Sequence, residues 1–468
     1  MKIEQLYTGC LAQGAYYIES EGDVAIIDPL REVQQYIDKA SEERSKIKYI
    51  FETHFHADFV SGHVTLSEKT GAPIIYGPTA KTTFDAIIAE DGQSFKLGKI
   101  ELVALHTPGH TMESTTYLLK DESGKDVAIF TGDTLFLGDV GRPDLAQKSN
   151  DISQEELAGT LFDSLRNKIM PLADDIMVYP AHGAGSACGK NMSSETMGKL
   201  GEQKRTNYAL RLDMTREEFI EEVLDGLKPP PAYFPMNVQL NKMGYDAVDE
   251  IISRGEHALS PEEFVELADS TEAVVIDVRT KDEFATAHVP GSIFIGLDGS
   301  FAPWVGELVV DVKTPLLLVC NDSQLKEALT RLSRVGFDNT LGYLKGGVEA
   351  YQRDGFEVDH VVQIDADELA SHYVESKFGK IIDVRKESEF DSEKIEGAQN
   401  YPLRLLGNSW KTLPATEPLT IHCRSGYRSL IAASILKSRG IHQIIDVKGG
   451  MSEMKKTNLP IETAITLS

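Results

Sequence analysis

Metal-binding side chains follow several apolar segments in the first 190 residues of this chain. Residues 53–59 read Thr-His-Phe-His-Ala-Asp-Phe, which places two histidines and an aspartate at H-x-H-x-D spacing. The apolar residues between 46 and 53 predict a buried strand that ends at this group. Three further candidates each follow another strand-like run: His110, Asp133 and His182. Ligands that converge from several strand ends can form a metal site.

The first 250 residues or so resemble the metallo-β-lactamase superfamily, on H-x-H-x-D, T-P-G-H at 107–110 and G-D at 132–133. Members with two metals continue as H-x-H-x-D-H, and the last histidine binds the second metal. Position 59 is Phe here, and a phenyl ring cannot bind a metal, so the resemblance implies a single metal. In the similar persulfide dioxygenase branch, one Fe(II) is held by the equivalents of His54, His110 and Asp133. Two imidazoles and one carboxylate leave positions open for O2 and substrate.

The resemblance implies supporting roles for the other polar residues near this group. His56, Asp58 and His182 are expected to orient ligands or water rather than to bind the metal. Arg142 lies in a G-R-x-D turn and is a candidate to bind the anionic part of a thiol substrate, or to brace the turn. Cys188 lies in a Gly/Ser-rich loop, where it is either a substrate-facing cysteine or a small buried one.

The second half of the chain contains an internal duplication of about 100 residues. Val-Ile-Asp-Val-Arg at 275–279 recurs as Ile-Ile-Asp-Val-Arg at 381–385, and Lys-Gly-Gly at 345–347 recurs at 448–450. Short apolar strands alternate with helical patterns in both copies, which predicts α/β domains with parallel sheets. Each copy resembles the rhodanese domain.

The second copy carries a candidate nucleophile. A predicted strand at 419–422 is followed by Cys-Arg-Ser-Gly-Tyr-Arg-Ser at 423–429 and then by a helix. Such a loop can direct backbone N–H groups at Cys423, and Gly426 permits the tight backbone. Arg424, Arg428 and the helix N-terminus favour a thiolate. A cysteine phosphatase loop would instead need arginine at the sixth place after the cysteine, where Ser429 stands.

The first copy departs from this pattern. Cys320 is followed by Asn-Asp-Ser-Gln-Leu-Lys-Glu, without glycine or arginine. Asp322 and Glu327 would disfavour a thiolate. We therefore expect the first rhodanese-like domain to be inactive.

Composition limits the classes of partner. The formal net charge of −26 disfavours binding to nucleic acid or to anionic membranes. No segment approaches 18 consecutive apolar residues, and the N-terminus lacks the apolar core of a signal peptide. Four cysteines in 468 residues argue against a disulfide framework. A cytoplasmic protein, without membrane or nucleic acid partners and compatible with a homo-oligomer, is expected.

The expected fold class is α/β, with three domains. These are a metallo-β-lactamase αβ/βα sandwich at 1–252, an inactive rhodanese-like domain at 256–358, and an active rhodanese domain at 362–468. The arrangement resembles the rhodanese-fused persulfide dioxygenases of sulfide detoxification.

That resemblance implies one Fe(II) per chain and oxidation of a low-molecular-weight thiol persulfide by O2 to sulfite and thiol. Cys423 would couple this reaction to the formation or the use of thiosulfate, and the sequence leaves both directions open. One alternative is a zinc thioester hydrolase of the glyoxalase II kind, fused to a sulfurtransferase. The other is a non-catalytic sulfur carrier or scaffold.

Overall fold

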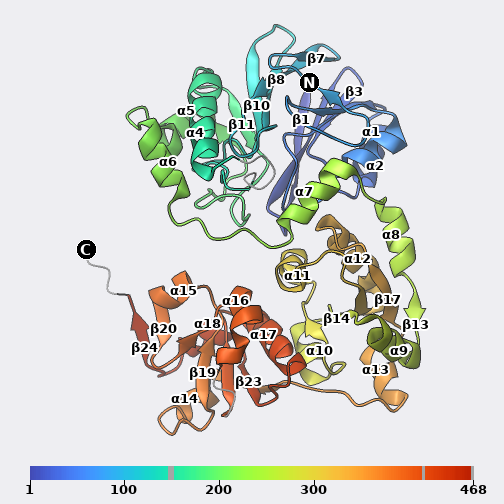
Figure 1. The fold of residues 1–468 in the computed structure, drawn as a ribbon, viewed down its shortest axis with the longest axis vertical. Helices are drawn as coiled ribbons and strands as arrows, with labels where there is room; N and C mark the ends of the chain where they lie inside the picture. Colours follow the sequence, from blue (N-terminus) through green and yellow to red (C-terminus); the bar gives the residue numbers. More distant parts are fainter. Residues whose placement is uncertain (146–151, 414–416, 465–468) are drawn as a thin grey trace. The chain divides into compact units, whose positions relative to one another are not determined.

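The structure is a computed structural model that describes residues 1–145, 152–413 and 417–464 (Figure 1). The chain divides into two compact units. The first consists of residues 1–248 with 333–336, and the second of residues 249–332 with 337–468. Among the described residues, no helix is both long and apolar enough to cross a membrane.

The first unit contains two six-stranded sheets. The first sheet has the order β1-β2-β3-β4-β5-β6, and the second has the order β12-β11-β10-β9-β8-β7. The strands of the first sheet are β1 (Lys2–Thr8), β2 (Gln13–Ser20), β3 (Asp23–Ile27), β4 (Lys46–Phe51), β5 (Ile74–Tyr76) and β6 (Ile87–Ile88). Those of the second are β7 (Ser94–Leu97), β8 (Ile100–His106), β9 (Thr115–Lys120), β10 (Asp126–Gly132), β11 (Met177–Pro180) and β12 (Gly198–Lys199).

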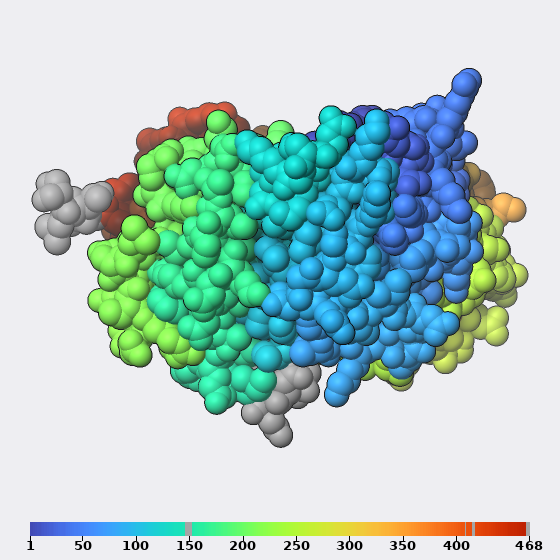
Figure 2. Space-filling model, turned by 90° about the horizontal axis from the view of Figure 1, so that it is seen from above, coloured from blue at the N-terminus to red at the C-terminus, as the bar shows by residue number. Residues whose placement is uncertain are grey.

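Helices cover the outer faces of both sheets, so the layers are αβ/βα (Figure 1). The helices of this unit are α1 (Gln34–Glu42), α2 (His63–Thr70), α4 (Gln154–Ser164), α5 (Leu200–Thr206), α6 (Arg216–Leu224) and α7 (Phe234–Met243). Aromatic rings from the two sheets, including Phe51 and Phe130, pack in the central layer. Figure 2 shows one face of the molecule, on which blue-to-cyan residues lie directly beside teal-to-green ones. Burial of apolar surface between the layers holds the strand ends in place.

The second unit contains two five-stranded sheets, and the strands within each sheet run parallel. We call these two sheets, each together with its helices, the first and second modules. The first has the order β13-β17-β16-β14-β15, and the second has the order β18-β23-β22-β19-β21. The strands of the first are β13 (Ala258–Leu259), β14 (Val274–Asp277), β15 (Ile293–Phe294), β16 (Leu316–Val319) and β17 (Thr340–Leu344). Those of the second are β18 (Val362–Ile364), β19 (Lys380–Asp383), β21 (Gln399–Asn400), β22 (Leu419–His422) and β23 (Ile444–Val447). Strands β20 (Glu393–Ile395) and β24 (Ile461–Thr463) form a separate antiparallel pair.

Helices follow the strands in both modules, as parallel connections require. Helix α8 (Val248–Gly255) precedes the first module, whose helices are α9 (Pro261–Thr271), α10 (Lys281–Thr286), α11 (Phe301–Val309), α12 (Leu325–Arg334) and α13 (Gly347–Arg353). The second module has α14 (Ala366–Ser371), α15 (Glu387–Ser392), α16 (Leu403–Ser409), α17 (Tyr427–Ser438) and α18 (Gly450–Met454). Residues 429–436 of α17 are all buried, so this helix lies in the interior of its unit.

The repeated Asp-Val-Arg sequence has the same structural role in both modules. Arg279 Nη2 donates to Asp277 Oδ2 over 2.6 Å, and Arg385 Nη2 donates to Asp383 Oδ2 over 2.7 Å. Each arginine also donates to a backbone carbonyl oxygen eight residues further along its own module. A buried carboxylate at the strand end is thereby paired and hydrogen-bonded, as a buried charge must be.

The predicted fold class is confirmed, because an αβ/βα sandwich precedes two modules with parallel sheets. The predicted boundaries at 1–252, 256–358 and 362–468 stay a prediction, since the two compact units of the structure do not test them.

Candidate functional site

The three predicted metal ligands lie together at one end of the sandwich. His54 follows β4, His110 lies in the loop between β8 and β9, and Asp133 directly follows β10. Their candidate ligand atoms all lie within 4.8 Å of one another, and all three side chains are buried. Asp133 Oδ2 is 3.8 Å from His54 Nε2 and 3.5 Å from His110 Nε2. These separations suit donors arranged around one metal ion.

A close approach of two backbones brings these strand ends together. Gly132 is the last residue of β10, and a methyl group on it would lie 2.6 Å from Thr53 Cβ. Its φ of 54° also lies in the left-handed region, which favours glycine. Gly132 thus lets the chain that carries Asp133 reach the turn that carries His54.

Hydrogen bonds direct one nitrogen of each histidine into the site. His110 Nδ1 lies 2.8 Å from the carbonyl oxygen of Arg142, which can only accept, so Nδ1 carries the proton and Nε2 keeps its lone pair. Thr53 Oγ1 donates to Asp28 Oδ2 over 2.8 Å and accepts from His54 Nδ1 over 3.0 Å. Because His54 Nδ1 donates its proton to Thr53, the Nε2 of His54 keeps a lone pair that can bind a metal. Hydrogen bonds made by the ring nitrogen that does not bind the metal fix the tautomer of a histidine ligand.

The carboxylate of Asp133 is ionised and only half satisfied. Its Oδ1 accepts from His182 Nδ1 over 2.8 Å, while Oδ2 is buried with no hydrogen-bond partner among the described residues. Burial acts to raise the pKa of Asp133, but His182 and His54 outweigh it and hold that pKa well below its usual range. An unpartnered buried carboxylate oxygen beside two imidazole nitrogens fits a bound cation.

His182 and Asp58 lie behind the ligand Asp133, to which His182 is hydrogen-bonded. Burial acts to lower the pKa of His182, but Asp133 and Asp58 raise it well above its ordinary value. His182 Nε2 is 2.8 Å from Asp58 Oδ2. Cys188 completes a group of three possible donors with these two residues. Burial, Asp58 and Asp133 raise the pKa of the Cys188 thiol well above its ordinary value, so this cysteine is protonated.

His56 belongs to a separate group of possible donors with Asp28 and Glu52, and its ring centroid lies 4.2 Å from that of His54. Its Nε2 lies 3.1 Å from Asp28 Oδ1 and 3.6 Å from Glu52 Oε2. Burial and Asp28 raise the pKa of Glu52 well above its ordinary value. Asp28 and Glu52 were not identified from the sequence, because neither belongs to a recognisable motif. His63 Nδ1 lies 3.4 Å from Glu52 Oε1, and the residue is fully buried.

Arg142 is held by the protein itself. Its guanidinium donates to both carboxylate oxygens of Asp144 over 2.7 Å, and to the carbonyl oxygen of Lys228 over 2.6 Å. The side chain is 6% exposed. This arrangement favours the bracing interpretation over contact with a substrate.

The predicted cysteine loop of the second module connects β22 to α17. Gly426 has a φ of 97°, and its N–H donates to Cys423 Sγ over 3.2 Å. Met451 N of α18 donates to the carbonyl oxygen of Cys423 over 2.8 Å, which anchors the loop from the other side. Cys423 is 1% exposed. The loop thus has the predicted form, with a backbone donor at the sulfur.

The two arginines of this loop differ in their environment. Arg428 makes a bidentate ion pair with Glu389, at 2.7 and 2.9 Å. The Arg428 guanidinium lowers the pKa of Glu389 to about 2. Arg424 is exposed, and its side chain has no hydrogen-bond or ion-pair partner within the described parts of the chain. Arg424 therefore remains available to an anionic ligand.

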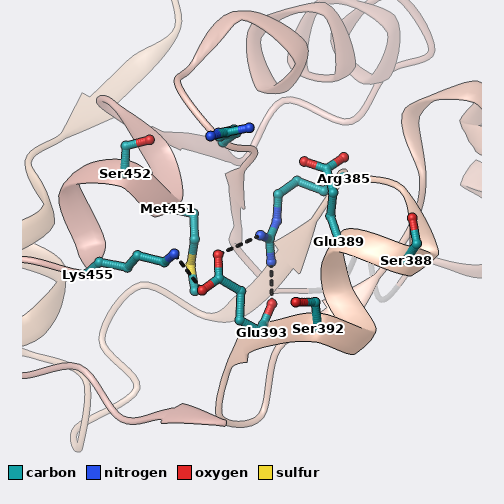
Figure 3. A pocket seen from close by; sticks show the side chains of 9 residues that line it. Arg385, Ser388, Glu389, Ser392, Glu393, Met451, Ser452 and Lys455 are labelled. Atoms are coloured by element: carbon teal, nitrogen blue, oxygen red, sulfur yellow. Dashed lines mark hydrogen bonds and ion pairs between the residues drawn. The ribbon is translucent and has the colours of Figure 1, made fainter. Parts of the chain in front are cut away.

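A cavity of about 350 Å³ opens beside the loop and is strongly polar (Figure 3). Figure 3 shows Arg385 and Lys455 both directed at Glu393, and Lys455 Nζ is 2.5 Å from Glu393 Oε2. The residues that line the cavity are Arg385, Ser388, Glu389, Ser392, Glu393, Arg424, Met451, Ser452 and Lys455. Cations and carboxylates alternate around it, so it suits a polar or zwitterionic ligand.

The equivalent cysteine of the first module lies in a different environment. Cys320 is 2% exposed and directly follows β16. Burial, with Asp277 and Asp322, raises its pKa to about 12. The thiolate is thus disfavoured at neutral pH, with Asp322 acting as the sequence indicated. The other predicted residue, Glu327, instead accepts from Arg331 Nη1 over 3.1 Å, and burial has the largest effect.

Comparison with known proteins relates each part of the chain to a family. Residues 8–182 match the metallo-beta-lactamase superfamily, and residues 260–354 and 365–457 each match the rhodanese-like domain. The structure resembles the crystal structure of a metallo-beta-lactamase from Staphylococcus aureus, with a TM-score of 0.64 and 30% identity. That similarity covers 74% of this chain and 98% of the other.

Two curated relatives match the N-terminal half. The mitochondrial persulfide dioxygenase of Mus musculus is 30% identical over 222 residues, which cover 47% of this chain and 78% of that protein. The cytoplasmic hydroxyacylglutathione hydrolase of Arabidopsis thaliana is 34% identical over 149 residues, which cover 30% of this chain. The match spans only 56% of the length of that hydrolase.

Proposed function

From the premise that this chain belongs to the metallo-β-lactamase superfamily and carries two rhodanese-like domains, we propose that it is an iron-dependent persulfide dioxygenase with sulfurtransferase activity. The substrates would be O2 and a low-molecular-weight thiol persulfide. The balanced reaction is R-S-SH + O2 + H2O giving R-SH, sulfite and two protons.

One observation carries the proposal. Phe59 is fully buried where two-metal relatives have a ligand, beside a centre made of His54, His110 and Asp133. Two imidazoles and one carboxylate on a single metal are typical of non-haem iron sites that bind O2 and substrate together. Fe(II) held by these residues would supply the redox chemistry that adds oxygen to the terminal sulfur.

The protein residues would orient the reactants and handle protons. His110 and His54 present Nε2 because their Nδ1 atoms are hydrogen-bonded elsewhere. The His182 imidazolium lies between Asp133 and Asp58, where it fixes the ligand carboxylate. Cys188 lies in the same cluster, and its neutral thiol would face the persulfide substrate. Arg142 would keep this loop closed through Asp144 and Lys228.

The second module would exchange sulfur with thiosulfate through Cys423. The thiolate attacks the outer sulfur of thiosulfate, the S–S bond breaks, and sulfite leaves with the electron pair while Cys423 keeps the sulfane sulfur. The reverse reaction forms thiosulfate from sulfite and the Cys423 persulfide. The N–H of Gly426 and the guanidinium of Arg424 would stabilise the sulfur anions. The Arg428–Glu389 pair would hold the first turn of α17 in place.

Anaerobic purification followed by metal analysis and oxygen uptake tests the proposal. We expect one iron per chain, and oxygen consumption with a thiol persulfide that yields an equal amount of sulfite. His54→Ala, His110→Ala and Asp133→Ala should each abolish the uptake.

Similarity to a hydroxyacylglutathione hydrolase favours a second candidate, a zinc thioester hydrolase fused to a sulfurtransferase. Two zinc ions per chain together with hydrolysis of an acylglutathione would establish that candidate and refute the dioxygenase. A third possibility, a sulfur carrier without catalysis, would be supported by a stable Cys423 persulfide with neither activity.

A further inference from the structure

The first module packs against the helix that carries the Cys423 loop. Tyr427 is the first residue of α17, and its hydroxyl donates to the carbonyl oxygen of Gly296 over 2.7 Å. The ring of Tyr427 occupies the space beside Gly299, where an added methyl group would lie 2.3 Å from ring atom Cζ. Further along α17, Ser434 Oγ accepts from Phe294 N over 3.0 Å. Tyr427 directly follows Gly426, so these contacts reach the loop itself.

Lys281 of the first module lies close to the same loop. It is the first residue of α10 and is partly buried. A methyl group on Gly426 would lie 3.8 Å from Lys281 Nζ, and Gly426 N is 3.2 Å from Cys423 Sγ. These contacts keep the ammonium within about 10 Å of the sulfur, given ordinary bond lengths. Exposed charges this far apart are largely screened at physiological ionic strength, where the Debye length is about 8 Å, but Cys423 is buried and Lys281 partly buried, so this pair is screened much less.

Lys281 has an unusual position among the cations of this region. Its side chain has no hydrogen-bond or ion-pair partner in the portion of the chain that the structure describes. The nearby carboxyl of Asp446 is buried, which raises its pKa to about 6, and Lys281 acts in the opposite direction. Asp446 instead accepts from Gln363 Nε2 over 2.8 Å.

The other cations around the loop are already paired with carboxylates. Arg428 is bound by Glu389, Arg385 by Asp383 and Lys455 by Glu393. The transfer step combines a thiolate with thiosulfate, which carries two negative charges, and all three charges remain when sulfite leaves. Arg424 and Lys281, which have no carboxylate partner among the residues that the structure describes, would be the cations that offset this charge.

We propose that the first module is a functional part of the Cys423 site, in which Lys281 supplies a positive charge that attracts anionic sulfur donors to the loop. The inference rests on the proposed sulfur transfer for its biological meaning. Lys281 is a positioning residue here, because it acts through the electrostatic field at the loop and not by contact with the reacting sulfur. The first module, which we expect to be inactive itself, would then contribute to sulfur transfer at the second module.

The test measures the local field directly in the full-length protein. Cys423 is alkylated at neutral pH with iodoacetate, an anion, and with iodoacetamide, which is neutral, and the modified peptide is quantified by mass spectrometry. The ratio of the two rates reports the potential at the sulfur and cancels changes in thiol ionisation. For Lys281→Ala we expect the ratio to fall about threefold, and for Lys281→Glu about tenfold, as removal or reversal of one charge at this distance predicts.

Two further variants distinguish charge from structure. Lys281→Arg should keep the ratio near that of the unmodified protein. Lys326→Ala removes an exposed lysine of the same module on α12 and should leave the ratio unchanged. The KM for thiosulfate should rise in Lys281→Ala by a factor similar to the fall in the ratio, with a smaller change in kcat.

An alkylation ratio in Lys281→Ala equal to that in Lys326→Ala would overturn the inference. The alkylation assay needs no sulfurtransferase turnover, so its result is independent of the proposed function. Absence of thiosulfate turnover in the unmodified protein would contradict the proposed function by itself.

Discussion

The ring of Phe59 lies against the imidazole of His56, with ring centroids 4.3 Å apart and both side chains fully buried. The Nε2 of His56 in turn lies 3.1 Å from Asp28 Oδ1. An apolar ring therefore occupies the place from which a second-metal ligand would come. The neighbouring Asp58, His182 and Cys188 form a second group of possible donors, in which Asp133 and Asp58 outweigh burial and raise the pKa of His182.

Phe59→His should restore a donor beside that cluster. We expect the variant to bind a second divalent ion per chain under zinc-supplemented conditions, because Asp58, His182 and the new imidazole would supply three ligands. Metal content per chain, measured by mass spectrometry, checks this stoichiometry. Phe59→Leu is the matched control and should retain one ion. A stoichiometry that stays at one in Phe59→His would show that residue 59 does not determine the metal count.

Thr53→Val should weaken the metal centre without changing its ligands. The substitution keeps the side-chain shape but removes the hydroxyl that accepts from His54 Nδ1 and donates to Asp28. Loss of a contact that orients a ligand lowers metal affinity by about 10- to 100-fold. Competition with a chelator under anaerobic conditions measures the change. Thr65→Val is a suitable control, since Thr65 is buried and its hydroxyl has no partner among the described residues.

The sequence was sufficient to predict which residues would converge, but not all of their contacts. His54, His110 and Asp133 each follow a strand, β4 in the first sheet and β8 and β10 in the second, so the ligands come from both sheets of the packed sandwich. Asp28 was missed because it lies 25 residues before its partner Thr53, and no motif links the two positions. Its role appears only when β3 and β4 are seen to pair side by side.

The same limit applies to the Cys423 loop. Arg424 and Arg428 look equivalent in the sequence, yet Glu389 from α15 neutralises only Arg428. The helix was predicted from residue 430, whereas α17 begins at Tyr427. Its first turn is polar, so the apolar pattern does not include it. Charge pairing between segments far apart in the chain leaves no local signal, which is also why the position of Lys281 could not be foreseen.

Cys423→Ser should separate the two proposed activities. The substitution removes the nucleophile of the second module and leaves His54, His110 and Asp133 untouched. Oxygen uptake with a persulfide should largely persist, while sulfite accumulates and thiosulfate output falls to background. Ion chromatography of both anions measures the division. Unchanged thiosulfate output would refute the coupling and require another role for Cys423.

The last prediction compares the two equivalent cysteines. Both follow a buried strand and are almost fully buried, at 2% exposure for Cys320 and 1% for Cys423. Burial and two aspartates raise the pKa of Cys320 to about 12, so only a minute fraction is thiolate at pH 7. Cys423 has the N–H of Gly426 at its sulfur, and the exposed Arg424 directly follows it in the chain. We therefore expect Cys423 to react with iodoacetamide at least about tenfold faster than Cys320 at pH 7, because the thiolate is the reactive species.

Persulfidation should follow the same order. After treatment with thiosulfate, mass spectrometry should find the added sulfur on Cys423, and Cys320→Ala should leave sulfur transfer nearly unchanged. Raising the pH from about 7 to about 9 should increase the alkylation of Cys320 by about tenfold per pH unit, since its raised pKa lies above this range. Persulfide found mainly on Cys320 at neutral pH would contradict the assignment of the first module as inactive. It would mean that Asp277 and Asp322 do not control the ionisation of this thiol, and that donors from elsewhere in the first module stabilise the sulfur anion.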